Sequence, residues 1–348
     1  SVGASAGQVG TLAQGGNGAG ATSCDTKPYL AGCGGKTGLT NTPISGNAQG
    51  GDAVAGATGI GGGGGGAGAV ITSGDLALAP ARNAWVQGGR GGAAGTSAGA
   101  GGGGAGLVFM GGTLLVSGND LIGGAGGDGT STSAGGGGGV GLFFQGKAFT
   151  FNWQGDVHRI LGGYGGASGG STGAAVVVAT DGASVTNISN RFGTGFQGGY
   201  GAAGVGSIPD GSGGDAMDIF GSNNTFMNRG YVNPGGSAGH AALAIGLRVQ
   251  GDNNTIINAN GGSLEGGWSL LNPTQTAPGG VAVELTGNGN ILELQAGYAM
   301  GGKAIAAGGG NILALGGSSD GTFDVSKIVA ALDNTTGLEQ YQGFAEYQ

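Results

Sequence analysis

Clumped glycine is the feature that most limits the folds open to this chain. Of its 348 residues, 95 are glycine and only 7 are proline. Collagen is excluded, because a triple helix needs glycine at every third position and abundant proline. Glycine has no side chain to bury and loses much conformational freedom on folding. The clumps must therefore lie either in flexible loops or in places where backbone packs directly on backbone.

Short apolar runs alternate with the glycine-rich stretches along most of the chain. These runs begin near Val70, Leu107, Leu142, Val176, Met217, Leu243, Val281 and Ile305. They are rich in β-branched and aromatic residues and lack a helical period, so they predict short strands. One such unit cannot bury its apolar face, but units stacked at about 4.8 Å cover one another. The sequence therefore predicts an all-β fold, a right-handed parallel β-helix (solenoid) with glycine-rich loop insertions.

Repeated asparagines suggest how the corners of such a solenoid are built. Asn-Asn-Thr occurs at residues 223–225 and again at 253–255, and each is followed by a further asparagine, Asn228 or Asn258. We expect these side chains to stack at a corner. N-linked glycosylation is the functional alternative for them.

The glycine-rich inserts themselves admit two structures. Examples are residues 122–139 and 161–174, which combine glycine mainly with alanine, serine and threonine. A flexible linker is usually richer in serine and charge. This composition favours ordered, polyproline-II-like segments that pack closely where no Cβ fits. Flexible loops are the alternative.

Charge excludes several classes of partner. The net charge is −8, with 11 lysines and arginines, and the pI is near 4.5. No basic face is available for counterion release, so we expect no nucleic-acid partner and no anionic membrane surface. No run of 18 apolar residues occurs, so no transmembrane helix is expected.

The two cysteines, Cys24 and Cys33, would close a small loop if they paired. Zinc binding is not expected, because neither a second cysteine pair nor a nearby histidine is present. We interpret the pair as a disulfide, which indicates an oxidising compartment outside the cytoplasm. Two reduced thiols without a function are the alternative.

Catalytic patterns in this sequence have little weight. The pattern G-x-S-x-G occurs repeatedly, but 95 glycines produce it by chance, and no helix follows any of these serines. Histidine is limited to His158 and His240. Asp215 and Asp218 with Asp210 suggest a weak calcium loop, against the alternative of ordinary turn carboxylates. We expect no catalytic residues, no metal and no cofactor.

Four aromatic residues stand within or beside the glycine-rich stretches: Tyr164, Phe196, Tyr200 and Trp268. Rings on protruding loops offer apolar surfaces to sugar rings or protein partners. We therefore take these four as candidate ligand-binding residues. The alternative is that each ring folds back over its own loop.

The chain resembles the passenger domain of bacterial autotransporters, which are type V secreted proteins. The resemblance lies in a strand, a turn and a glycine run, as in LLVSGNDLIGGAGGDG and FNWQGDVHRILGGYGGASGG. Residues 321–347 are similar to the segment that leads into the autochaperone region, with a Tyr-x-Gly-Phe element at Tyr341, Gly343 and Phe344. The likeness covers most of residues 60–348 as a pattern and has motif specificity only after residue 320.

The resemblance implies a domain organisation and a role. Residues 1–60 would form an N-terminal cap, 61–320 the β-helix, and 321–348 the start of an autochaperone-like segment, before an absent translocator barrel. Display on the bacterial outer membrane or secretion is implied, and a short cysteine loop would obstruct passage through a barrel least. We expect an adhesin that binds host glycans, matrix protein or neighbouring cells, and that meets a membrane only through the barrel. The alternatives are a polysaccharide-active β-helix enzyme and a rigid spacer or self-associating passenger.

Overall fold

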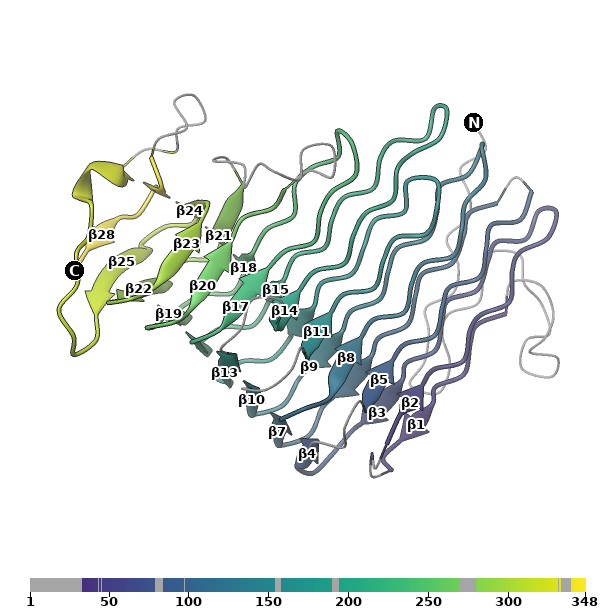
Figure 1. Ribbon diagram of the computed structural model, residues 1–348, viewed down its shortest axis with the longest axis horizontal. Helices are drawn as coiled ribbons and strands as arrows, with labels where there is room; N and C mark the ends of the chain where they lie inside the picture. The colour runs from purple at the N-terminus through teal and green to yellow at the C-terminus, as the bar shows by residue number, and fades with distance from the viewer. Residues whose placement is uncertain are drawn as a thin grey trace.

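The computed structural model describes residues 33–42, 44, 46–78, 84–96, 98–153, 158–189, 194–268, 280–330, 332 and 339–348. Within these residues all strand pairs are parallel, and the strands form three sheets. Each turn of the chain adds one strand to each sheet in succession (Figure 1). The protein is thus a parallel β-helix, which confirms the predicted fold class.

We name the sheets in the order in which a turn visits them. Sheet 1 contains β1 (Leu39–Thr40), β3 (Ala69–Ile71), β6 (Leu107–Phe109), β9 (Leu142–Phe144), β12 (Val176–Val178), β15 (Met217–Ile219), β18 (Leu247–Val249), β21 (Val281–Leu285), β24 (Lys303–Ala306), β27 (Tyr341–Gln342) and β26 (Ile328–Val329). Sheet 2 contains β4 (Leu76–Leu78), β7 (Thr113–Val116), β10 (Ala148–Trp153), β13 (Ser184–Ser189), β16 (Thr225–Asn228), β19 (Thr255–Asn258), β22 (Ile291–Gln295), β25 (Ile312–Gly316) and β28 (Glu346–Tyr347). Sheet 3 contains β2 (Ala48–Gln49), β5 (Trp85–Gln87), β8 (Asp120–Ile122), β11 (Arg159–Leu161), β14 (Gly195–Gln197), β17 (Tyr231–Asn233), β20 (Ser263–Glu265) and β23 (Ala299–Gly301).

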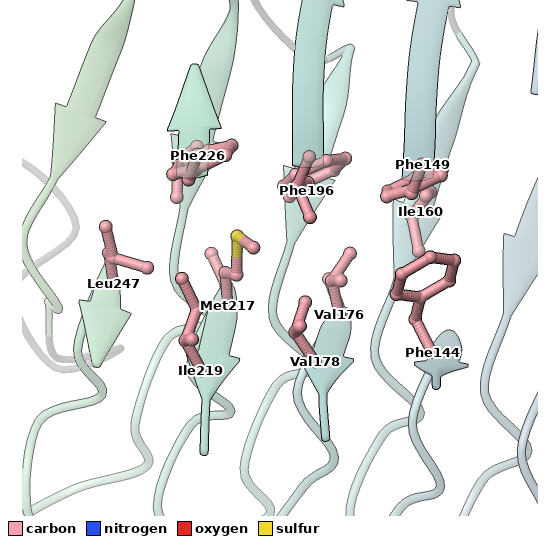
Figure 2. Packing of buried hydrophobic residues seen from close by; sticks show 14 of the residues in the cluster. Phe144, Phe149, Ile160, Val176, Val178, Phe196, Met217, Ile219, Phe226 and Leu247 are labelled. Carbon is pink, nitrogen blue, oxygen red and sulfur yellow. The ribbon is translucent and has the colours of Figure 1, made fainter. Parts of the chain in front are cut away.

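A column of apolar side chains fills the space between the sheets (Figure 2). Alternate residues of each strand point inward, so the same position of successive turns is buried. Phenylalanine rings form part of this column: Phe109 lies 5.8 Å from Phe144, and Phe149 lies 5.9 Å from Phe196, between ring centroids. Each turn thereby covers the apolar face of its neighbour, which a single turn cannot do alone.

Asparagine ladders stabilise the corners, as the sequence predicted. Asn187 Nδ2 donates to Asn228 Oδ1 at 2.9 Å, and Asn228 Nδ2 donates to Asn258 Oδ1 at 3.0 Å. A second ladder includes Asn254, whose Nδ2 donates to Asn290 Oδ1 at 3.0 Å. These side chains are buried, and repetition gives most of their polar atoms partners that solvent cannot supply. Asn187 Oδ1 and Asn290 Nδ2 are buried without a partner among the described residues.

The glycine-rich inserts connect each strand of sheet 3 to the next strand of sheet 1, and most are ordered excursions of the backbone (Figure 1). In the insert after β2, the amides of Gly63 and Gly66 donate to the carbonyls of Val54 and Gly51, so the two segments run antiparallel. Equivalent segments of successive turns lie side by side. They form two layers, an outgoing layer that continues sheet 3 and a return layer that leads into sheet 1.

Hydrogen bonds in these layers repeat with a period of three residues. The amides of Gly50, Ala53 and Gly56 donate at 2.9, 2.9 and 2.8 Å to carbonyls of the next turn in the outgoing layer. The residue after each of these positions faces the other layer, as in the bond from Gly51 N to Lys36 O at 2.7 Å. The third residue faces outward. A period of three is that of polyproline II, so the ordered alternative for the inserts is confirmed.

Close packing of neighbouring backbones explains the glycine in the cross-layer positions. A Cβ at Gly104 would fall inside the contact radius of the carbonyl oxygen of Gly66, the equivalent residue of the preceding turn in the return layer, and one at Gly139 would meet the carbonyl of Gly104 in the same way. Outward positions are different. A Cβ at Gly102 would meet its nearest atom, the carbonyl oxygen of Gly137, at 3.4 Å.

The described part of the predicted N-terminal cap, residues 1–60, belongs to the solenoid itself, because β1 pairs with β3 and β2 with β5. Residues 321–348 likewise contribute β27 and β28, which pair with β24 and β25. Beside them is a short 3-10 helix, Val325–Lys327. No helical segment among the described residues reaches the length and apolarity needed to cross a membrane.

We expect Gly104→Ala to lower the free energy of unfolding by ~1–3 kcal/mol, because the added methyl group must force two backbones apart. Gly102→Ala is the matched control two residues away. Its methyl group finds room, so stability should stay unchanged or rise by up to ~1 kcal/mol through the unfolded chain. Chemical denaturation of both variants measures the difference, and equal effects would contradict the layer packing.

Candidate functional site

Three aromatic side chains form a row on the outer face of the outgoing layer. Tyr164, Tyr200 and Trp268 occupy outward positions of different turns, where their carbonyls accept in-layer bonds from Gly126, Gly165 and Ser237. The Tyr164 and Tyr200 rings are stacked, with centroids 5.6 Å apart and planes inclined by 22°. Trp268 meets Tyr200 edge-on at 5.8 Å. We call these three residues the aromatic row.

Glycine allows the aromatic row to close across a missing side chain. Gly236 occupies the outward position of the turn between Tyr200 and Trp268, as its carbonyl accepts from Gly201 N at 3.0 Å. Without a side chain there, Trp268 reaches Tyr200 directly. Tyr164 is 42% exposed at the other end of the row. The rings therefore cover one another in part and present an exposed apolar surface.

Polar groups of sheet 3 hold the centre of the aromatic row. Gln197 Nε2 donates to the Tyr200 hydroxyl at 2.6 Å, and Arg159 Nη1 donates to Gln197 Oε1 at 3.0 Å. Burial raises the pKa of Tyr200, and Tyr164 adds to this, while Arg159 and Gln197 oppose it. The Tyr200 ring is thus fixed by its hydroxyl, which accepts from Gln197 at the end of β14, the strand that leads into this segment.

Phe196 does not belong with the loop aromatics, and its selection as a ligand-binding residue is corrected. It lies in the middle of β14 and is 1% exposed. Its ring packs in the core beside Phe149 and Phe226, at 5.9 and 6.3 Å. The flanking glycines suggested a loop, but the alternation of the strand turns this ring inward.

A second cluster combines three carboxylates with Arg248 on the outer side of sheet 1. Asp218, Arg248 and Glu284 occupy paired positions of β15, β18 and β21. Arg248 Nε lies 2.9 Å from Asp215 Oδ2 and 3.7 Å from Asp218 Oδ1, and Nη1 lies 3.3 Å from Glu284 Oε2. One guanidinium therefore serves three acidic groups.

This excess of negative charge perturbs Asp218. Burial first, and then the neighbouring Asp215, raise the pKa of Asp218 to about 7, and Arg248 only partly offsets them. Asp218 therefore keeps its proton at pH values where an ordinary aspartate is ionised. A carboxyl group in this state is suited to donate a proton at neutral pH.

The calcium loop suggested by Asp210, Asp215 and Asp218 is not formed. Asp210 instead accepts the amides of Gly204 and His240, at 2.8 and 3.0 Å, while the other two turn to Arg248. Among the described residues no group of three or more acidic, histidine or cysteine side chains is arranged to hold a metal ion.

His158 is buried, at 8% exposure, and its Nδ1 lies 3.1 Å from Asp120 Oδ1 of the preceding turn. The same Asp120 oxygen accepts the amide of Arg159 at 2.9 Å. The pair therefore joins two turns. Cys33 is fully buried and disulfide-bonded, and Cys24 lies outside the described residues.

Sequence reasoning found the rings of the aromatic row but missed what supports them. Arg159 and Gln197 carry no motif. Gln197 stands three residues before Tyr200 in the same segment, and Arg159 reaches Gln197 only because β11 and β14 are neighbours. Arg248 was missed for the same reason. Residues that meet across adjacent turns are separated in sequence by about the length of one turn. This separation is the only sequence signal for such a contact, and it varies with the length of each insert.

Comparison of the chain with models of known protein families, with curated proteins and with solved structures finds no match in any of the three. The resemblance to autotransporter passengers therefore stays a prediction. Any functional conclusion must rest on the geometry of the chain's own residues.

We expect the stability of the protein to fall as the pH rises from about 4 to about 7. Asp218 holds its proton more tightly when folded, with a pKa of about 7 against an ordinary value of 3.8. The stabilisation by Asp218 is therefore complete below its ordinary pKa and is lost as the pH rises through its raised pKa. Between these two values the free energy of unfolding falls by at most ~1.4 kcal/mol per pH unit. Asp218→Asn should remove this part of the slope in denaturation curves at pH 5–8.

Asp210→Asn serves as the control for this experiment. The pKa of Asp210 is lowered, first by the amide of Gly204 and then by that of His240. Asp210 is therefore ionised throughout pH 5–8, and the variant should keep the wild-type slope. Parallel curves for wild type and Asp218→Asn would contradict the assignment.

Proposed function

We propose that this protein is a bacterial surface adhesin of the autotransporter passenger type, which binds its receptor through the outer face of the outgoing glycine layer. The observation that carries this proposal is the aromatic row. Tyr164, Tyr200 and Trp268 are held in mutual contact on an ordered surface remote from the apolar core. The receptor would be a host glycan, a matrix protein or a neighbouring cell.

The energetics of the aromatic row suit recognition by contact area. Stacked and edge-on rings contribute apolar surface at little entropic cost, and aromatic residues dominate binding energy at many interfaces. The row is already assembled, so binding would order few further side chains. Charge contributes little here, because the Arg90–Asp128 ion pair of this layer, at 2.6 Å, neutralises itself.

One observation favours the second candidate function, an enzyme acting on polysaccharide. Asp218, with its raised pKa of about 7, has the protonation state of a general acid. Such enzymes place two carboxyl groups on opposite sides of the bond to be cleaved. Here Asp215 and Glu284 both contact the same Arg248. This arrangement suits an ion-pair cluster that links successive turns better than it suits a catalytic pair. Release of reducing ends from a polysaccharide panel tests this candidate.

The test of the adhesin proposal is a glycan and matrix-protein array probed with the wild-type chain and with a Tyr164, Tyr200 and Trp268 triple-alanine variant. We expect selective binding by the wild type and a loss of at least about tenfold in the variant. Phe220→Ala is the control, since Phe220 is 49% exposed but lies outside the row. This control should bind as the wild type does.

Two results would contradict the proposal. If the triple variant binds as tightly as the wild type and circular dichroism shows both folded, the aromatic row is not the binding surface. If the wild type binds nothing on the array, the rigid spacer or self-associating passenger is favoured. Analytical ultracentrifugation then separates these two, because only self-association raises the apparent mass with concentration.

A further inference from the structure

A pocket of about 280 Å³ opens at the corner between sheet 2 and sheet 3, away from the glycine layers. Its lining residues are Arg229, Ala259, Asn260, Gln295, Ala296, Gly317, Ser318 and Ser319. They come from four successive turns and lie at or just beyond the ends of β16, β19, β22 and β25. Three of these strands are labelled beside one another in Figure 1. The stacking of the solenoid therefore assembles the pocket from residues distant in sequence.

Arg229 is the only charged residue of the pocket lining. The ion pairs in the described part of the chain involve Arg90, Arg248 and His158, and none of them includes Arg229. Arg229 is an exposed residue, so its positive charge is open to a ligand that enters the pocket from solvent. A guanidinium presents paired N–H donors that match a carboxylate.

The remaining polar groups of the pocket are neutral hydrogen-bonding groups. Asn260 and Gln295 supply carboxamides, and Ser318 and Ser319 supply hydroxyls. Gln295 Nε2 donates to Glu293 Oε1 at 2.8 Å, which leaves the Gln295 carbonyl oxygen as an acceptor. Hydroxyls and carboxamides both donate and accept, so they match the hydroxyl groups of a sugar.

We propose that this pocket binds one carboxylate-bearing sugar unit, with the carboxylate on Arg229 and the sugar hydroxyls on the carboxamides and serines. Its volume of about 280 Å³ is just below the ~300–1,000 Å³ typical of small-molecule sites, which suits a single ring. The small side chains of Ala259 and Ala296, and the absence of one at Gly317, leave that space open. This site is separate from the aromatic row and stands if that row binds something else.

A carboxylate-bearing sugar fits these groups better than a bare inorganic anion does. Phosphate sites typically gather several charged or backbone N–H donors around one group. Here a single guanidinium is accompanied by four neutral polar side chains. One charge with several hydroxyl partners is the chemistry of a sialic or a uronic acid.

The experiment is isothermal titration of the wild-type chain with four probes at low ionic strength. Methyl α-N-acetylneuraminide and methyl β-D-glucuronide carry the carboxylate from two different sources. Methyl β-D-glucoside is the neutral counterpart of the glucuronide, and sodium phosphate is the inorganic anion. We expect one of the two acidic glycosides to bind at least about tenfold more tightly than the neutral glycoside and phosphate.

Variants place the binding in the pocket. Arg229→Gln should weaken binding of the acidic glycoside by about 10- to 100-fold. The affinity of Arg229→Lys should lie between those of the wild type and Arg229→Gln, because lysine keeps the charge and loses the paired donors. Ala296→Leu should also weaken binding by filling the pocket without changing charge. Lys147→Gln removes one exposed positive charge at the opposite corner and is the matched control. It should bind as the wild type does.

Several results would overturn the proposal. These are an equal affinity for the neutral glycoside, an equal affinity for phosphate, no binding of either acidic glycoside, or an Arg229→Gln variant that binds as the wild type does. Thermal denaturation verifies that each variant is folded, and Arg229→Lys keeps the test valid if Arg229→Gln is not. The triple-alanine variant of the aromatic row should retain the acidic glycoside, which separates this site from the proposed function.

Discussion

The close approach of two backbones in the glycine layers is the constraint on which the rest of the structure depends. Carbonyl oxygens such as that of Gly66 occupy the space that a Cβ of Gly104, the equivalent residue of the next turn, would need. This contact replaces the side-chain packing that the inserts lack and supplies amides with partners, as between Gly104 N and Gly89 O at 2.9 Å. The high glycine content is therefore a requirement of backbone packing. The glycine-rich inserts form ordered layers that extend the solenoid beyond its three sheets.

The layers and the sheets share one register, and this places both candidate sites. The outgoing layer continues sheet 3, so the spacing of the strands also sets the spacing of the aromatic row. The corner between sheet 2 and sheet 3 has no glycine layers. Polar side chains line the pocket at this corner. The two surfaces differ because one is built from polyproline-II-like backbone and the other from the turns that end β16, β19, β22 and β25.

Local patterns predicted most of the fold, whereas relations between turns were out of reach. The apolar runs at Leu107, Leu142, Val176, Met217 and Val281 begin strands of sheet 1. The asparagine ladders also followed from repetition. The prediction that Phe196 binds a ligand was wrong, because its strand has only three residues and the glycines beside it resemble those of an insert. Arg229 could not be found, since its pocket depends on which residues of three later turns lie beside it.

The period of three in the glycine layers separates two kinds of position within one short segment. In-layer and cross-layer residues are fixed by backbone contacts, while a Cβ at an outward residue such as Gly102 would make only an ordinary contact, at 3.4 Å. Outward positions recur at about 9 Å along a segment and about 4.8 Å between turns. The outer face is thus a grid whose points accept different side chains while the scaffold stays the same. Such a surface can acquire a new specificity through single substitutions, without any change in loop length.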